Sequence, residues 1–158
     1  MPYDPDVLVQ PGQRAPSFRL DNIATGELVI DPWTEGRLVL AFFKVNCPVC
    51  QMVAPKVQAL ADAGVPVVAI GQDPASKLAS YAERFGQRVP TLSEPPPYRV
   101  ADAFGVSAVP TLFVVGADGM IEDIAPSWDR EVWNRVAAVF GAGPVSRPGD
   151  GLPSFRPG

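Results

Sequence analysis

The stretch KVNCPVCQMVAP, residues 44–55, contains both cysteines of this 158-residue chain, which has no histidine. It follows a run that is apolar throughout residues 38–43, which is typical of a central strand covered on both faces. Apolar side chains recur at helical spacing from Val49 to Leu60, and they predict a helix that starts at the cysteines. We therefore expect the two thiols where a buried strand turns into a helix.

The two cysteines of this turn are not equivalent. Cys47 falls at the cap position, and Pro48 takes the first helical position, where a missing N–H costs no hydrogen bond. Free backbone N–H groups and the positive end of the helix dipole then favour the thiolate of Cys47. Cys50 faces inward and should be less acidic. These positions predict that Cys47 attacks a disulfide and that Cys50 resolves the mixed disulfide.

Three other uses of the two thiols compete with redox chemistry. They could be ordinary buried residues, or a static disulfide, although a bridge over three positions constrains little of the unfolded chain. They could bind zinc, but two cysteines without histidine leave a tetrahedral site half empty unless two chains share the metal. The C-x-x-C spacing with Pro48 at the strand end favours the redox-active pair, for which no bound cofactor or metal is needed.

The rest of the chain predicts an α/β fold. Strand patterns alternate with helical ones, which indicates a central mixed β-sheet flanked by helices, and residues 18–20 and 28–30 read as a short hairpin. Residues 1–11 are expected to be a flexible arm, and residues 12–140 the folded domain. Residues 141–158 contain nine Gly or Pro, so we expect a disordered tail that can be removed with little loss of stability.

Charge and hydropathy exclude some classes of partner. The net charge of -4 argues against nucleic acid, whose phosphates attract basic surfaces. No stretch approaches the roughly 20 apolar residues of a membrane span. The acidic, polar start has none of the features of a secretory leader, so a cytoplasmic location is expected, with a periplasmic or exported one open if a leader was removed.

Two segments resemble the thioredoxin superfamily. CPVCQMVAP is similar to its active-site helix, including a proline five positions after the second cysteine, and residues 105–121 resemble its cis-proline segment. The resemblance implies a thioredoxin-like fold with a cis peptide between Val109 and Pro110. It also implies that these two residues pair with the substrate backbone, with Pro48 and Asn46 completing the substrate-binding surface beside the cysteines.

The beginning of the domain resembles particular groups within this superfamily. GQRAPSFRL, residues 12–20, is similar to the N-terminal signature of TlpA-type thiol-disulfide oxidoreductases and of alkyl hydroperoxide reductase/thiol-specific antioxidant proteins. An extra strand and helix at residues 91–104 point to the same group. Membership implies a monomeric thiol-disulfide oxidoreductase with a part in antioxidant defence and redox homeostasis. Its partners would be protein thiols or disulfides and an electron donor such as a reductase.

Several residues depart from the pattern of the superfamily. Asn46 stands where tryptophan is usual, and Ala41 where thioredoxins carry a buried aspartate that accepts the proton of the second cysteine. Asp73 or Glu83 could replace that aspartate, although a helix cap and a solvated helix residue are the simpler roles for them. Lys44 could lower the pKa of the first cysteine, or could simply be solvated.

Three other functions remain open at this stage. The fold could serve as a non-catalytic docking module with a structural disulfide, or two chains could bridge a metal or cluster through their cysteine pairs. The third is a thiol peroxidase of peroxiredoxin type. That pattern requires proline and threonine where this chain has Leu40 and Lys44, so we do not expect a dedicated peroxidase.

Overall fold

The computed structural model describes residues 7–158, and at its centre lies one seven-stranded mixed sheet. Its strand order is β2-β1-β5-β4-β3-β6-β7. The strands are β1 (Arg19–Asn22), β2 (Leu28–Ile30), β3 (Leu38–Phe43), β4 (Val67–Gly71), β5 (Thr91–Ser93), β6 (Thr111–Val115) and β7 (Ile121–Pro126). Strands β3, β4 and β5 are parallel, and the remaining pairings are antiparallel.

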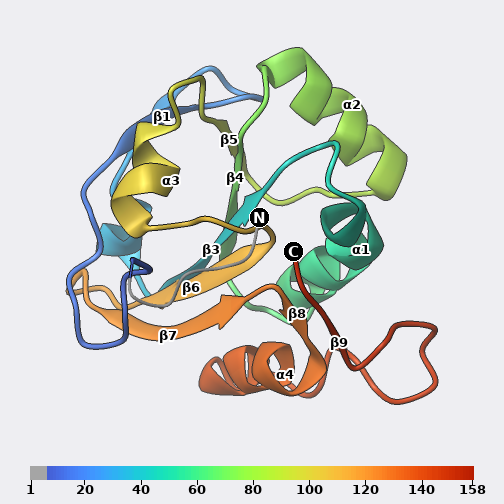
Figure 1. Cartoon of the computed structure of the whole chain (residues 1–158). Helices are drawn as coiled ribbons and strands as arrows, with labels where there is room; N and C mark the ends of the chain where they lie inside the picture. Colours follow the sequence, from blue (N-terminus) through green and yellow to red (C-terminus); the bar gives the residue numbers. More distant parts are fainter. Residues whose placement is uncertain (1–6) are drawn as a thin grey trace.

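Within the described part of the chain, four α-helices surround this sheet. They are α1 (Pro48–Asp62), α2 (Ala75–Phe85), α3 (Arg99–Phe104) and α4 (Arg130–Val139), and a 3-10 turn covers Pro32–Glu35. Figure 1 shows α1 and α2 on one side of the sheet, α3 on the other, and α4 beside β7. The predicted α/β architecture, with a central mixed sheet flanked by helices, is confirmed.

Strand β3 holds the centre of the core, and it packs on both faces. Successive side chains of a strand point to opposite sides. The ring of Phe42 contacts Phe104 and Phe113 on the α3 side, with centroids 5.3 and 5.6 Å away. Phe43 points to the α2 side, where its centroid lies 5.0 Å from that of Tyr81. This two-sided packing sets where β3 ends and therefore where α1 begins.

The hairpin and β5 extend the sheet beyond β4, at the edge opposite β7. β1 and β2 pair as the sequence predicts, and β1 continues the sheet by pairing with β5. After β5 the carboxylate of Glu94 turns inward, and its Oε1 accepts hydrogen bonds from the backbone N–H groups of Val100 (2.6 Å) and Ala101 (2.9 Å). Burial raises the pKa of Glu94, and the two N–H groups oppose this rise. The buried carboxylate holds the start of α3.

The flexible arm expected for residues 1–11 is only partly covered by the structure, because residues 1–6 lie outside the described residues. The rest of that segment does not behave as an arm. Leu8 is buried, and the N–H of Val9 donates to the carbonyl of Phe104 at 3.0 Å. The expectation is therefore corrected for residues 7–11, which an apolar contact and a backbone hydrogen bond hold against α3.

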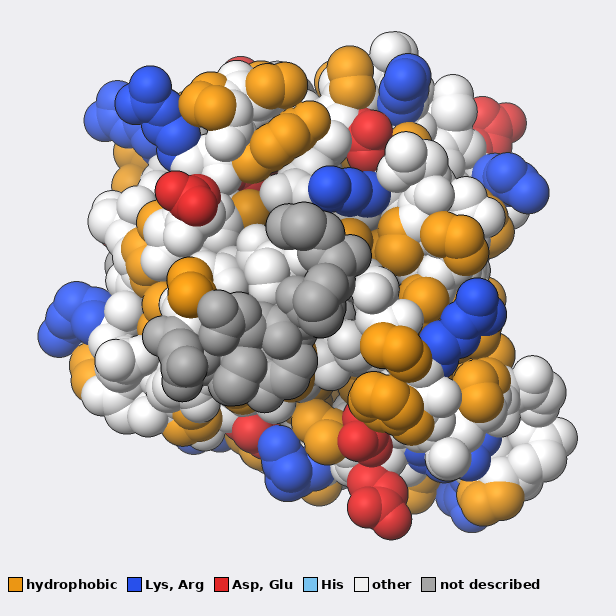
Figure 2. All heavy atoms as spheres, viewed as in Figure 1, with side chains coloured by type: hydrophobic (Ala, Val, Ile, Leu, Met, Phe, Trp, Pro, Cys, Tyr) orange, Lys and Arg blue, Asp and Glu red, His pale blue; other side chains and the backbone are white. Residues whose placement is uncertain are grey.

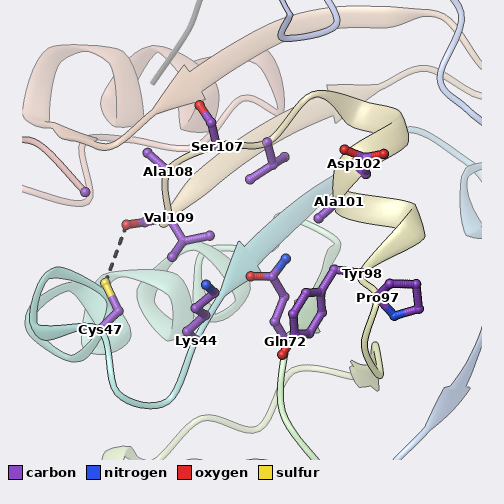
Figure 3. Close-up of a pocket in the computed structure, with 12 residues that line it drawn as sticks. Lys44, Cys47, Gln72, Pro97, Tyr98, Ala101, Asp102, Ser107, Ala108 and Val109 are labelled. Atoms are coloured by element: carbon purple, nitrogen blue, oxygen red, sulfur yellow. Dashed lines mark hydrogen bonds between the residues drawn. The ribbon is translucent and has the colours of Figure 1, made fainter. Parts of the chain in front are cut away.

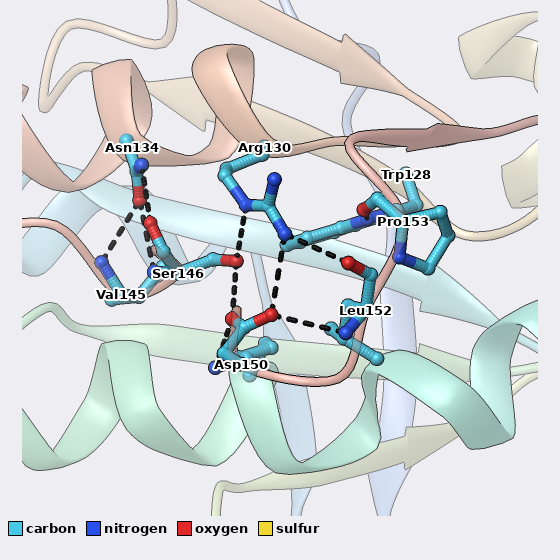
Figure 4. Close-up of polar contacts among 9 residues, drawn as sticks. Trp128, Arg130, Asn134, Val145, Ser146, Asp150, Leu152 and Pro153 are labelled. Atoms are coloured by element: carbon cyan, nitrogen blue, oxygen red, sulfur yellow. Dashed lines mark hydrogen bonds and ion pairs between the residues drawn. The ribbon is translucent and has the colours of Figure 1, made fainter. Parts of the chain in front are cut away.

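The expected disordered tail is also corrected, because residues 144–158 pack against α4 and α1. A short strand β9 (Phe155–Arg156) pairs antiparallel with β8 (Trp128–Asp129). Upstream of it, the Arg130 guanidinium donates to Ser146 Oγ at 2.9 Å, to Asp150 Oδ1 at 3.2 Å and to the carbonyl of Leu152 at 2.8 Å (Figure 4).

Further polar contacts complete the anchor of the tail. Asn134 Oδ1 accepts from the N–H groups of Val145 (2.9 Å) and Ser146 (3.1 Å), as Figure 4 shows. Lys56 of α1 forms an ion pair with Asp150 at 2.9 Å. Hydrogen bonds from Ser146 and Lys56 hold the pKa of Asp150 well below its usual range. These contacts explain why a segment without an apolar stripe is ordered.

Charged side chains of both signs are interspersed on the face of the molecule drawn in Figure 2. On this face, basic and acidic groups alternate with apolar ones, and neither sign gathers into a patch.

We predict that removing residues 144–158 lowers the thermal stability of the protein. The half-buried side chains of Val145 and Leu152 pack on the core, and at about 1 kcal/mol each their loss amounts to roughly 2 kcal/mol. For a domain of this size that corresponds to a fall of about 4–8 °C in Tm. Thermal denaturation followed by circular dichroism measures it, and an unchanged Tm would restore the expectation of a disordered tail.

Candidate active site

The turn between β3 and α1 places Cys47 at the start of the helix, as the sequence predicts. Cys47 is the N-cap residue in an extended conformation (φ -87°, ψ 116°), and Pro48 follows at the first helical position. Cys47 Sγ accepts a hydrogen bond from the N–H of Cys50 at 3.2 Å. The sulfur thus takes the place that a serine or aspartate oxygen usually occupies at a helix start.

Asp73 holds the loop before Cys47. Its Oδ2 accepts from the N–H of Val45 at 2.9 Å, and the side-chain amide of Gln51 donates to the carbonyl of Val45 at 2.7 Å. The cap expected of Asp73 is wrong, because Pro74 occupies the cap position of α2 and makes no side-chain cap hydrogen bond. The carboxylate reaches the neighbouring loop instead, since β3 and β4 end side by side in a parallel pair.

The two thiols are free and differ in acidity. The pKa of Cys47 is lowered to about 6, chiefly by a hydrogen bond from the side chain of Cys50. Partial burial opposes this shift. The backbone N–H groups of Cys50 and Val49 and the positive charge of Lys44 lower the pKa further. Burial, together with that hydrogen bond and the negative charge of Cys47, raises the pKa of Cys50. At neutral pH Cys47 is therefore mainly thiolate and Cys50 is a thiol.

Cys50 lies against a small internal cavity of about 10 Å³, which Ala41, Tyr81, Gln87 and Pro110 also line. Neither Asp73 nor Glu83, the two suggested replacements for the buried aspartate, is among the described residues that line this cavity. The Tyr81 hydroxyl donates to the carbonyl of Cys50 at 3.1 Å, and burial, with the charges of both cysteines, raises the pKa of Tyr81.

Gln87 is a polar residue of this cavity that the sequence did not single out. It is buried, and its Nε2 has no hydrogen-bond partner among the described residues. A buried amide donor without a partner is rare in folded proteins. Gln87 therefore adds a polar residue to the cavity beside Cys50, whereas Ala41, at the position of the thioredoxin aspartate, adds none. No local pattern marks Gln87, because it follows α2 and meets Cys50 only through tertiary packing.

The Val109–Pro110 peptide lies beside the cysteines and is cis, as the resemblance implies. The carbonyl oxygen of Val109 lies 3.5 Å from Cys47 Sγ, a contact drawn in Figure 3. On the far side of the peptide, the N–H of Ser127 donates to the carbonyl of Pro110 at 2.7 Å. Two segments that are 62 residues apart in sequence thus meet at the sulfur.

An open pocket of about 390 Å³ leads to Cys47. Figure 3 shows it between the Val109 segment and α3, with Lys44, Gln72 and Tyr98 on its walls. The ammonium of Lys44 lies 5.9 Å from the centre of the Tyr98 ring, an arrangement that a cation–π contact favours. Asn46 and Pro48 are exposed and lie outside the described lining of this pocket.

The described residues 7–158 offer no obvious metal site. No three His, Cys, Asp or Glu side chains in this part of the chain come together in a way that could hold a metal ion. Within the same residues, no helix has the length and apolar character needed to cross a membrane.

Several solved structures that share this fold are described as thiol-disulfide oxidoreductases or thiol:disulfide interchange proteins. The thioredoxin domain of a thiol-disulfide oxidoreductase from Bacteroides vulgatus is 15% identical, with a TM-score of 0.71 over 83% of this chain and 98% of that one. A thioredoxin-family thiol:disulfide interchange protein from Chlorobium tepidum is 19% identical, with a TM-score of 0.64 over 87% and 99%. These similarities show that the fold is thioredoxin-like.

A third similar structure is a peroxidoxin, BcpB from Mycobacterium tuberculosis. It is 25% identical, with a TM-score of 0.62 over 74% of this chain and 85% of that one. No curated protein matches the sequence. The profile of the AhpC/TSA family matches residues 11–124, which is most of the chain and includes both cysteines and Pro110. The protein therefore belongs to the AhpC/TSA family.

Proposed function

We propose that this protein is a thiol-disulfide oxidoreductase that exchanges its Cys47–Cys50 dithiol with disulfides of protein partners. The observation that supports it best is the inequality of the two thiols. An accessible Cys47 with a pKa of about 6 stands in front of a buried Cys50 whose pKa is raised. Disulfide exchange needs such a pair, one thiolate to attack and one thiol to release the product.

The exchange takes place in two steps. The Cys47 thiolate attacks a substrate disulfide, so that one S–S bond breaks, a mixed disulfide forms and one substrate thiolate leaves. Cys50 then gives up its proton and attacks Cys47 Sγ, which forms the Cys47–Cys50 disulfide and releases the second substrate thiolate. The leaving thiolates take up protons, and two electrons pass from the protein to the substrate. An external dithiol, such as a reductase, restores the pair.

The surface around Cys47 supports a polypeptide as substrate. The backbone of Val109 borders Cys47 Sγ and can pair with an extended chain in the manner of a strand edge. Pro110 completes this edge, and the exposed Asn46 and Pro48 provide the opposite rim. We further propose that the protein works as a monomer, in the cytoplasm or, where a leader has been removed, in an exported compartment.

A thiol peroxidase is the second candidate, because the family includes peroxide reductases and a peroxidoxin is among the similar structures. Its weakness lies in the residues around Cys47. Lys44 occupies the position where the peroxidase pattern has threonine, and its ammonium turns toward Tyr98. A threonine hydroxyl could both donate to and accept from a peroxide, whereas an ammonium can only donate.

Substitution of each cysteine should separate the two steps. We predict that Cys47→Ser abolishes reduction of insulin by dithiothreitol above the thiol blank, because no accessible thiolate remains. Cys50→Ser should keep the first step and accumulate mixed disulfides, which non-reducing electrophoresis and mass spectrometry of a lysate reveal.

Three outcomes, two from this experiment and one from a hydrogen peroxide assay of the wild type, decide between the candidates. Adducts formed by Cys47→Ser but not by Cys50→Ser would reverse the assigned roles. A wild type that reduces no insulin, together with two variants that trap nothing, would favour the docking module. Rapid consumption of hydrogen peroxide without insulin reduction would favour the peroxidase.

The acidity of Cys47 leads to a pH prediction. Alkylation of the wild type by iodoacetamide should be half-maximal near pH 6 rather than near the usual thiol value of about 8.5. Because the hydrogen bond from Cys50 is the main cause, Cys50→Ala should move this midpoint upward, whereas Cys50→Ser keeps a donor and should move it less. Mass spectrometry confirms which cysteine reacts, and the same midpoint in all three proteins would contradict the assigned cause.

A further inference from the structure

The last residues of the described chain lie at the edge of the active site. Gly158 lines the same pocket as Cys47 and Val109. It contacts the main chain of Val109 so closely that a Cβ on Gly158 would meet the carbonyl of Val109. Its N–H donates to Ser127 Oγ at 3.0 Å.

The contact of Gly158 is made with the backbone that a substrate would use. Val109 presents its carbonyl to Cys47 Sγ, and it is the residue at which we propose that an extended substrate pairs. Ser127 links the two partners, because its N–H donates to the carbonyl of Pro110 while its hydroxyl accepts from Gly158. Gly158 thus occupies space against the main chain of Val109, at which a bound peptide would have to lie.

The path of the segment across the site is fixed at several points. β9 pairs with β8, with Trp128 opposite Arg156, and the carbonyl of Ser154 accepts from the N–H of Arg130 at 2.9 Å. Arg156 Nη1 lies 4.0 Å from Met52 Sδ on α1. In Figure 1 the chain accordingly runs from β9 past α1 and ends near the start of that helix.

The segment has a firm base and a lightly held end. Its base is the polar anchor of Asp150, with Arg130 at 3.2 Å and Lys56 at 2.9 Å. Phe155 of β9 is 54% exposed, and beyond β9 the hydrogen bond from the N–H of Gly158 to Ser127 Oγ holds the last described residues. The end can therefore leave the site while the base remains bound.

We propose that residues 155–158 are a specificity-determining strap, which competes with polypeptide substrates for the backbone of Val109. The inference rests on the proposed oxidoreductase function. A small disulfide reaches Cys47 through the open pocket without pairing to Val109, so the strap does not slow it. A protein disulfide must first displace Gly158. The strap thereby favours small disulfides and those proteins that bind well enough to replace it.

Two glycine substitutions in the full-length protein test the strap. Gly158→Ala adds a methyl group that meets the main chain of Val109, so the end of the strap should leave the site. The matched control is Gly143→Ala, since a Cβ there has nothing within 4 Å and its φ lies outside the left-handed range. Ser127→Ala should also release the end of the strap from the site, because it removes the acceptor of the Gly158 N–H. It keeps every backbone hydrogen bond of Ser127.

The measurement compares two disulfides. Each reduced variant is mixed with insulin, as a polypeptide disulfide, or with dithiobis(nitrobenzoate), as a small one, and the second-order rate constants are determined in a single turnover. For Gly158→Ala and Ser127→Ala, we expect the ratio of the insulin rate to the small-disulfide rate to rise about fivefold, the factor expected from loss of one hydrogen bond. Gly143→Ala should keep the wild-type ratio.

The outcomes separate the strap from the function on which it rests. If the wild type and the variants all reduce the small disulfide and have the same ratio of insulin rate to small-disulfide rate, the strap inference is wrong and the oxidoreductase function stands. An equal rise in Gly143→Ala would also overturn the strap, since that change touches nothing near Val109. If the wild type reduces neither disulfide, the proposed function itself fails.

Discussion

The position at which β3 ends is the constraint on which the active site depends. Rings from both sides of the sheet hold this strand, with Phe42 against Phe113 and Phe43 against Tyr81. Only residues 44–47 separate β3 from α1, so the unpaired N–H groups of the helix start point at Cys47, the N-cap residue. Any shift of β3 would move the sulfur away both from these donors and from the carbonyl of Val109.

The difference between the two thiols follows from this geometry. In one helical turn, Cys47 is placed at the rim and Cys50 in the core, where only 2% of its surface is exposed. The buried thiol donates to the exposed one, and this hydrogen bond both stabilises the Cys47 thiolate and keeps the proton on Cys50. The pair is therefore asymmetric without a carboxylate. Ala41 stands where thioredoxins have that group, and the buried Gln87 lines the same cavity.

The segment after α4 contacts both the helices of the fold and the surroundings of Cys47. Its base is held by charged and amide side chains of α1 and α4, and its end contacts the backbone beside the reactive sulfur. In this arrangement the same part of the chain packs on α1 and α4 and continues to the backbone of Val109, where we propose that substrates pair. Access to Cys47 is consequently a property of the folded chain as a whole and not of the C-x-x-C motif alone.

The sequence by itself determined the α/β class, the hairpin and the helix start at Cys47, each of which follows from apolar runs and helical periods along the chain. The cis peptide before Pro110 was implied by the resemblance of this segment to the thioredoxin superfamily. Only the tertiary structure decided the roles of Asp73 and Gln87 and the order of residues 144–158. Their contacts join residues far apart in the chain, such as Asp73 with Val45 or Gly158 with Ser127. A polar side chain leaves no periodic signal, so its partner is known only when the fold brings the two together.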